Sequence, residues 1–375
     1  MKYYIIAGEA SGDLHASNLM RELKKLDPQA LFRCWGGDLM VQEGAQLVRH
    51  YRDLAFMGFM EVVSNLGTIL NNIRYCKNDI LGFHPDVLIL VDYPGFNLRI
   101  ARFARTENIR VFYYISPQLW AWRPSRVKII RETVNRMFVI LPFENEWYRK
   151  YDYDVDWVGH PLLDVINEDL QIPDRKMFFE KNRLPDKPVI ALLPGSRKQE
   201  IHNILRIMVS VLPEFPEYQF VIAGASSLRE DFYRKICPDQ NVKIIFSQTY
   251  ALLKHSEAAI VTSGTATLET ALMGTPQVVC YKGYRISYMI ARKIVKVPYI
   301  SLVNLIMQRE SVNELIQYRL TKENLRAELM KILEDPLNRQ RIIQDYDQLK
   351  EKLGGRGASG RAANLMIQYL KKIEV

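Results

Sequence analysis

The segment Gly8–Asp13 places carboxylates at Glu9 and Asp13 and a hydroxyl at Ser11 directly after a short apolar run. It lacks the G-x-G-x-x-G spacing of a dinucleotide-binding turn, and its carboxylates would repel the phosphates of a dinucleotide. A polar ligand rich in hydroxyl groups suits this segment better. The alternative is that Ser11 or Asp13 only caps the helix that follows.

Asp92 is a candidate general base. It directly follows the apolar run Val87–Val91, and a Pro-Gly pair at Pro94 and Gly95 comes soon after it. A carboxylate held against apolar walls can have its pKa raised into a range useful for taking a proton from a substrate. The alternative is an aspartate that caps a helix starting near Asn97.

A glycine-serine turn after the apolar run Val189–Leu193 predicts an anion site. Gly195 and Ser196 open a helix, so main-chain N–H groups can point at an anion there. Arg197 adds a guanidinium that can bind two oxygen atoms at once. The turn has no Walker lysine pattern. The alternative is a basic turn that only meets solvent.

The segment Thr262–Glu269 also leads from an apolar run into a helix. Small residues let a ligand approach the backbone, and a helix N-terminus attracts negative charge. The candidate binding residues are Ser263, Gly264, Thr265, Ala266 and Thr267, with Glu269 within reach of ribose hydroxyls. The alternative is capping alone. Together with Gly195–Arg197, the segment predicts a site for a nucleoside diphosphate.

All of these segments follow strands of a predicted α/β fold. Continuous apolar runs rich in β-branched residues are typical of parallel sheets buried on both faces. Two such arrays predict two Rossmann-like, doubly wound domains that face each other across a cleft, with ligands beyond the carboxyl ends of the strands. The expected strands are residues 3–7, 31–35, 87–91, 110–115, 137–140 and 155–158, then 189–193, 219–223, 243–246, 258–261 and 277–281.

The pattern also predicts domain boundaries. We expect a first domain over residues 1–165 and a second over 188–340, joined by a polar, proline-bounded linker over 166–187. Residues 341–375 carry apolar stripes at helical spacing, and we expect these C-terminal helices to pack back on the first domain.

Composition excludes several classes of protein. With 48% hydrophobic and 25% charged residues in 375, the chain should bury sizeable cores rather than remain disordered. Its net charge of +9 favours anionic partners. The apolar runs are far shorter than the roughly 20 residues that span a bilayer. Four scattered cysteines fit free thiols in a reducing cytosol, and we expect no metal site.

Two further stretches are candidates for contact with lipid. Residues 54–66 are rich in methionine and phenylalanine, as surfaces that adapt to flexible acyl chains are. Residues 284–297 form a basic amphipathic pattern that suits an anionic headgroup layer. The alternatives are a buried core for the first and a solvated helix face for the second.

Eight segments along the chain form a specific series: Gly8–Asp13, Val91–Asn97, Ile115–Arg123, Leu141–Glu144, Gly159–Pro161, Leu192–Arg197, Ser263–Glu269 and Tyr299–Leu305. They occur in the order found in lipid-A-disaccharide synthases, and the chain resembles this family over nearly its whole length. The resemblance implies an inverting glycosyltransferase of the B type that uses no metal and no cofactor. The implied reaction joins UDP-2,3-diacylglucosamine to 2,3-diacylglucosamine 1-phosphate and yields the β-1,6-linked disaccharide 1-phosphate and UDP.

The resemblance also implies roles for individual residues. Asp92 would take the proton from the 6-hydroxyl of the acceptor, and Arg197 would steady the diphosphate. Ser263–Glu269 would hold UDP with Asn304 nearby, and the Gly8–Asp13 segment would form the acceptor side. The resemblance implies a cytoplasmic enzyme that associates peripherally with the inner membrane and binds no nucleic acid. A homo-oligomer is compatible with it.

Two departures and two alternatives accompany the resemblance. Gly95 stands where some relatives carry an acid, and His15 lies outside the family pattern. One alternative is another enzyme of this fold that acts on UDP-N-acetylglucosamine, either a glycosyltransferase or a 2-epimerase. The other is a basic nucleic-acid-binding protein, based on the charge and on Trp120, Trp122 and Arg123, although no nucleic-acid-binding motif supports it.

Overall fold

The computed structural model describes residues 1–53, 66–122, 124–167, 169–283 and 297–372. The chain divides into two compact units, one made of Met1–Asp164 with Leu353–Val375 and the other of Val165–Lys352. The stretches predicted to contact lipid, 54–66 and 284–297, lie almost entirely outside the described residues.

The first unit is built on a fully parallel sheet of seven strands. Its strand order is β3-β2-β1-β4-β5-β6-β7. The central strands are buried along their whole length, which is why they read as unbroken apolar runs. The strands are β1 (Lys2–Ala7), β2 (Leu31–Gly36), β3 (Gln46–His50), β4 (Val87–Val91), β5 (Val111–Tyr114), β6 (Arg136–Val139) and β7 (Asp156–Trp157).

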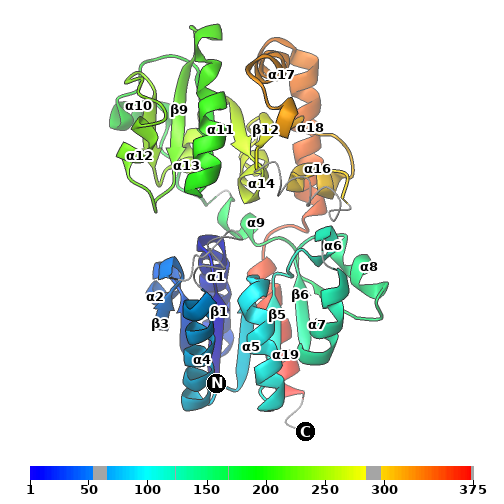
Figure 1. The fold of residues 1–375 in the computed structure, drawn as a ribbon. Coiled ribbons are helices and arrows are strands. Elements are labelled where there is room, and N and C mark those ends of the chain that lie inside the picture. The colour runs from blue at the N-terminus through cyan, green and yellow to red at the C-terminus, as the bar shows by residue number, and fades with distance from the viewer. Residues whose placement is uncertain (54–65, 123, 168, 284–296, 373–375) are drawn as a thin grey trace. The chain divides into compact units, whose positions relative to one another are not determined.

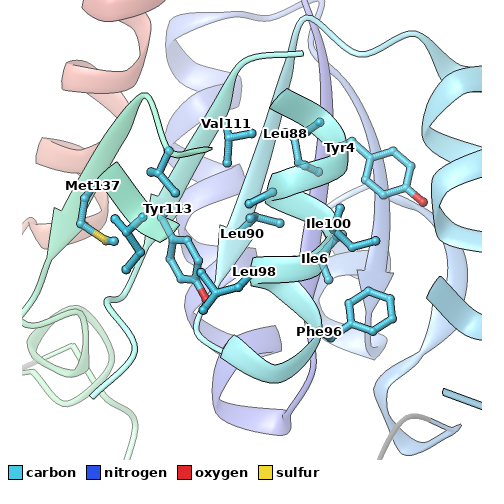
Figure 2. Close-up of a cluster of buried hydrophobic side chains, with 14 of the residues drawn as sticks. Tyr4, Ile6, Leu88, Leu90, Phe96, Leu98, Ile100, Val111, Tyr113 and Met137 are labelled. Atoms are coloured by element: carbon cyan, nitrogen blue, oxygen red, sulfur yellow. The ribbon is translucent and has the colours of Figure 1, made fainter. Parts of the chain in front are cut away.

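Helices cover both faces of this sheet (Figure 1). Apolar side chains of β1, β4 and β5 form one core with α4, α5 and α7, and Figure 2 shows Leu90, Leu98 and Tyr113 within it. Helix α19 packs beside α1. The helices are α1 (Ala10–Leu26), α2 (Asp38–Gln42), α4 (Leu66–Phe83), α5 (Pro94–Thr106), α6 (Leu119–Trp122), α7 (Val127–Thr133), α8 (Glu144–Arg149), α9 (Leu162–Val165, across the boundary) and α19 (Ala358–Lys371), with short 3-10 turns η1 (Tyr51–Asp53) and η2 (Pro124–Arg126).

The second unit repeats the architecture with a parallel sheet of six strands in the order β10-β9-β8-β11-β12-β13. The strands are β8 (Val189–Leu193), β9 (Gln219–Gly224), β10 (Lys243–Phe246), β11 (Ser256–Thr262), β12 (Gln277–Tyr281) and β13 (Glu314–Ile316). The helices are α10 (Arg175–Asn182), α11 (Lys198–Ser210), α12 (Glu230–Arg234), α13 (Thr249–Lys254), α14 (Thr265–Leu272), α16 (Leu302–Met307), α17 (Lys322–Glu334) and α18 (Pro336–Lys352), with η3 (Leu212–Glu214) and η4 (Gln317–Arg319). The predicted α/β class is confirmed for both units.

The predicted linker over residues 166–187 is wrong. These residues belong to the second unit, and they include helix α10. Phe178 and Phe179 of α10, with Leu184 behind them, are buried in the core of that unit. Two aromatic side chains within a polar stretch were enough to anchor it.

The C-terminal helices do not both pack on the first unit, contrary to the expectation for residues 341–375. Helix α18 belongs to the second unit, where the Tyr346 hydroxyl accepts a hydrogen bond from Gln277 Nε2 at 3.1 Å. Only α19 belongs to the first unit. Its N-terminus is capped by Asp164, whose carboxylate accepts the N–H groups of Gly357 at 2.6 Å and Ser359 at 2.8 Å. Helix α18 packs against α14, α16 and α17 of the second unit, so the prediction that residues 341–352 pack on the first unit is wrong.

Candidate functional site

The strand order places two predicted segments side by side in the first unit. The order reverses between β1 and β4, and their last residues, Ala7 and Val91, are paired. The loop after β1 leads into α1 and the loop after β4 leads into α5. In open parallel sheets, ligands bind beyond the carboxyl ends at such a reversal. Glu9 and Asp92 therefore share the most favourable edge of this sheet.

Gly8 and Tyr93 make this edge compact. A Cβ atom built on Gly8 would lie 2.3 Å from Cγ of Tyr93, which is closer than atoms of a side chain can approach. Glycine is thus required at position 8 because an aromatic ring from the loop after β4 covers it. The loop after β1 and the loop after β4 therefore pack directly against each other.

Asp92 has a strained backbone and a perturbed carboxyl. Its φ angle is 43° and that of Tyr93 is 48°, a left-handed conformation that non-glycine residues rarely adopt. Desolvation by surrounding protein atoms, and then the negative charge of Glu9, raise the pKa of the Asp92 carboxyl. Since the side chain remains exposed to solvent, water limits this shift without reversing it. An aspartate of raised pKa at this edge suits a general base.

Asp13 uses its carboxylate within the fold of the first unit, which favours a structural role over its predicted place on the acceptor side. It is 3% exposed, and its carboxylate accepts N–H groups from Gly37 at 2.8 Å, Leu39 at 3.2 Å and Met40 at 3.2 Å. These contacts cap α2 rather than α1, and they occupy the carboxylate. Glu9 and Ser11, which are both half-buried, remain as candidates on this side.

His15 is buried against His160, with their ring centroids 6.4 Å apart. Burial lowers the pKa of His15 to about 4 and that of His160 to about 3. Both rings are therefore neutral at neutral pH, and their fixed positions suit packing. Gly95 leaves open space around its Cα, so no side chain orients Asp92 from that position.

The second unit has an equivalent reversal between β8 and β11, where Leu193 pairs with Val261. The loops that follow these strands hold Gly195 and Gly264, with φ angles of 99° and 149°. Both angles favour glycine, so the two tight turns account for these residues. The predicted diphosphate segments are thus neighbours at one sheet edge, and each opens a helix.

Arg197 directly precedes α11 and is half-exposed, with its Nη1 3.0 Å from Glu200 Oε1. Ser196 is exposed beside it. A guanidinium on an exposed turn can reach an anion that also meets the N-terminus of the helix.

The hydroxyls at the start of α14 are occupied within the unit. Ser263 Oγ donates to the Ile300 carbonyl at 3.0 Å, and the buried Thr267 Oγ1 donates to the Gly264 carbonyl at 2.8 Å. The main chain of Thr267 is paired as well, because its N–H donates to the Gly264 carbonyl at 3.1 Å and its carbonyl accepts from Gln277 Nε2 at 2.8 Å. Thr265 and Ala266 lie in the first turn, where N–H groups have no intrahelical acceptor.

Glu269 lies one turn into α14, where the Tyr250 hydroxyl donates to its Oε1 at 2.8 Å. Burial raises the pKa of Glu269, and the hydrogen bond from Tyr250 opposes this shift. A carboxylate held in this way can accept hydrogen bonds from ribose hydroxyls.

Asn304 is fully buried, and its side chain has no spare atom for a ligand. Its Nδ2 donates to Val312 O at 2.8 Å and Glu314 Oε1 at 2.9 Å, and its Oδ1 accepts from Ser311 N at 2.9 Å and Val312 N at 3.0 Å. The amide holds the loop after α16, so the side chain has no donor or acceptor left for the predicted binding of UDP near Asn304.

Thr262 is a candidate that sequence reasoning missed. It is 4% exposed, and its Oγ1 has no hydrogen-bond partner among the residues that the structure describes. Its methyl group lies next to Gly195, since a Cβ there would be 3.6 Å from Thr262 Cγ2. The signal available in the sequence was a hydroxyl residue as the last position of an apolar strand.

Neither metal binding nor membrane crossing is indicated by the described side chains. In these ranges no three or more His, Cys, Asp and Glu residues gather as metal ligands. Within the same ranges, no helix combines the length and the hydropathy that crossing a bilayer needs. All four cysteines are buried and free, as predicted. Trp120 is buried with its Nε1 3.2 Å from Glu144 Oε1, so it cannot stack on a base.

A family model described as lipid-A-disaccharide synthetase matches residues 3–368. The chain belongs to the lipid-A-disaccharide synthase family. It is 41% identical over 376 residues to the lipid-A-disaccharide synthase of Syntrophus aciditrophicus, covering 98% of this chain and 97% of that protein. It is 38% identical over 373 residues to that of Nitrosococcus oceani, covering 98% and 96%.

Solved structures agree on the fold. UDP-GlcNAc 2-epimerase from Neisseria meningitidis, solved with bound UDP-GlcNAc, matches with a TM-score of 0.67 at 16% identity, over 99% of this chain and 100% of that chain. The calicheamicin glycosyltransferase CalG4 matches with a TM-score of 0.60 at 15% identity, over 99% and 98%. The family has the B-type glycosyltransferase fold, and its members are transferases of lipid A biosynthesis.

Proposed function

We propose that this protein transfers 2,3-diacylglucosamine from UDP to the 6-hydroxyl of 2,3-diacylglucosamine 1-phosphate. The observation that carries the proposal is the match to lipid-A-disaccharide synthases at 41% identity over 98% of the chain. In the transfer, a β-1,6 bond forms at the anomeric carbon with inversion. The bond to the diphosphate breaks, and UDP leaves with the bonding electron pair.

Asp92 is the general base in this proposal. Its carboxylate takes the proton of the 6-hydroxyl as the oxygen attacks, and the raised pKa makes it a stronger base than an ordinary aspartate. Glu9 and Ser11 lie at the same sheet edge, where they would bind hydroxyl groups of the acceptor sugar. The first unit is then the acceptor domain.

The second unit is the domain for the UDP-sugar. Negative charge builds on the diphosphate as it leaves, and fixed N–H groups together with a guanidinium can stabilise that charge. Gly195, Ser196 and Arg197 supply such groups at α11, and Gly264, Thr265 and Ala266 supply them at α14. Glu269 would bind the ribose, with Tyr250 holding one of its oxygens.

The substrates are lipids, and we propose that the enzyme meets them at the cytoplasmic face of the inner membrane. Its net charge of +9 favours an anionic lipid surface. The stretches 54–66 and 284–297 remain the predicted contacts. A homo-oligomer remains compatible with the proposal.

An assay of the purified protein with both diacylglucosamine substrates tests the proposal. We expect UDP and the disaccharide 1-phosphate in equal amounts, with the same rate when a metal chelator is present. UDP-N-acetylglucosamine serves as the control donor, because it lacks the acyl chains. The absence of both products, or faster use of the control donor, would contradict the proposal and favour another UDP-sugar enzyme of this fold.

A further inference from the structure

We propose that Asn97 and Tyr113 are positioning residues for Asp92, because both donate hydrogen bonds to its main-chain carbonyl and hold the backbone that directs its carboxyl. The inference rests on the proposed function, in which Asp92 is the general base. Neither residue needs to touch a substrate.

Asn97 joins the end of β4 to the start of α5. Its Nδ2 donates to the Asp92 carbonyl at 2.7 Å and to the Val91 carbonyl at 3.2 Å. Its side chain is fully buried in the first turn of α5. One amide group thus fixes the last carbonyl of the strand and the first carbonyl beyond it.

Tyr113 reaches the same carbonyl from the neighbouring strand. Its hydroxyl donates to Asp92 O in a short hydrogen bond, and its ring is fully buried. Figure 2 shows this ring in the apolar layer between the sheet and α5, near Leu90 and Leu98. A hydroxyl at the end of a rigid, packed ring has little freedom, so the carbonyl of Asp92 is held in one direction.

The backbone conformation at Asp92 and Tyr93 is energetically unfavourable for residues with side chains, so other contacts must stabilise it. Asp92 and Tyr93 are consecutive left-handed residues, with φ angles of 43° and 48°. Such strain persists only where the surroundings enforce it, and it concentrates at functional sites. The N–H of Asp92 lies at 3.3 Å from both Tyr114 O and Ile115 O, which is a loose contact. The two donors on the carbonyl are therefore the firmer restraint.

The side chain of Asn97 includes a feature that destabilises the fold and that packing alone does not explain. Its Oδ1 is buried without a hydrogen-bond partner among the described residues. A buried unpaired oxygen destabilises a fold, so an apolar side chain would pack better here if shape were the only requirement. The two N–H bonds of the amide give a reason for its presence.

The charged and titratable groups around Asp92 come from several elements. The negative charge of Glu9 at the start of α1 acts on the carboxyl and raises its pKa, the main-chain N–H of Tyr93 donates to it and lowers its pKa, and Tyr113 of β5 donates to the Asp92 main-chain carbonyl. Arg126 of η2 acts on Tyr113. Release of the carbonyl would let the carboxyl move away from Glu9, and its pKa would then fall toward the ordinary value for aspartate.

Tyr113→Phe is the decisive variant, since it removes one hydroxyl and keeps the ring. We expect kcat to fall roughly tenfold, as misplaced catalytic groups cause, with KM nearly unchanged. The acidic limb of the pH profile should move to lower pH. Tyr114→Phe is the matched control, because it removes an equally buried hydroxyl from the opposite face of the same strand. The control should keep the native kcat and the native limb.

Asn97→Ala provides a second, independent variant, and circular dichroism checks that each protein is folded. It should show the same shift of the acidic limb, and the double variant should lose less than the sum of the two effects, because both groups hold one carbonyl. If Asp92→Asn keeps native turnover, the proposed base itself is wrong. If Asp92→Asn is inactive while folded Tyr113→Phe and Asn97→Ala keep the native pH profile, only the positioning role is overturned.

Discussion

The carboxylate of Asp13 accepts the main-chain N–H of Gly37 at 2.8 Å, which fastens the start of α2 to α1. This bond joins two turns at the sheet edge that also carries Glu9. It gives Asp13 a structural role beside residues proposed to bind substrate, and the two roles can be separated by experiment.

Replacement of Asp13 by alanine should therefore destabilise the first unit. The N–H groups of Gly37, Leu39 and Met40 would lose their acceptor, at a cost of roughly 1–3 kcal/mol in the free energy of unfolding. Chemical denaturation measures this change. Asp38→Ala is the control, because it removes an exposed carboxylate from the same helix. Equal stability of the two variants would show that the Asp13 contacts contribute little.

Replacement of Arg197 by alanine should weaken UDP binding by roughly tenfold to a hundredfold, which is the range for losing a charged hydrogen-bond donor. Isothermal titration calorimetry with UDP measures the dissociation constant. Arg206→Ala removes the same charge from an exposed position further along α11 and should bind UDP as the native protein does. Equal weakening in both variants would point to a long-range effect of net charge instead.

Replacement of Thr262 by valine separates binding from stability. The buried hydroxyl has no partner among the described residues, so its loss should leave the free energy of unfolding unchanged or raise it by up to about 1 kcal/mol. UDP binding should weaken at the same time. Thr275→Val is the control, because that hydroxyl is buried and donates to Leu253 O at 2.8 Å. It should lose stability and keep UDP affinity, and the reverse pattern would remove Thr262 from the site.

Replacement of Tyr250 by phenylalanine should make stability more sensitive to pH. Burial raises the pKa of Glu269, so this residue favours the folded state below the ordinary glutamate pKa of about 4.3, and the benefit is lost as the pH rises through the raised value. Without the hydrogen bond from Tyr250, the pKa should rise further. Thermal unfolding at pH 8 and at pH 4 should show a larger loss at pH 8. Tyr318→Phe, which removes an exposed hydroxyl, should show none.

The sheet edges could be predicted from the sequence because parallel strands buried on both faces read as apolar runs. The four segments chosen at the ends of such runs fall at the two places where strand order reverses. Local patterns therefore located the candidate sites. They did so without information on how the strands pair.

The individual roles of Asp13 and Asn304 could not be predicted in the same way. Asp13 is occupied by N–H groups that lie 24 or more residues away, and Asn304 by a loop that begins at Ser311. Contacts between residues far apart in the sequence decide whether a polar side chain forms its hydrogen bonds within the fold or keeps them for a ligand. A local sequence pattern does not encode such contacts. The same holds for Thr262, whose lack of a partner is visible only in three dimensions.

The first unit closes around its sheet with α19, a helix held by the Asp164 cap after all of the second unit has intervened. During synthesis, the second unit is complete in the chain before the first can be. The flank of α1 that α19 covers has its partner helix only when the last residues of the chain have been made. The order in which the two units become complete during synthesis is therefore the reverse of the order in which they begin.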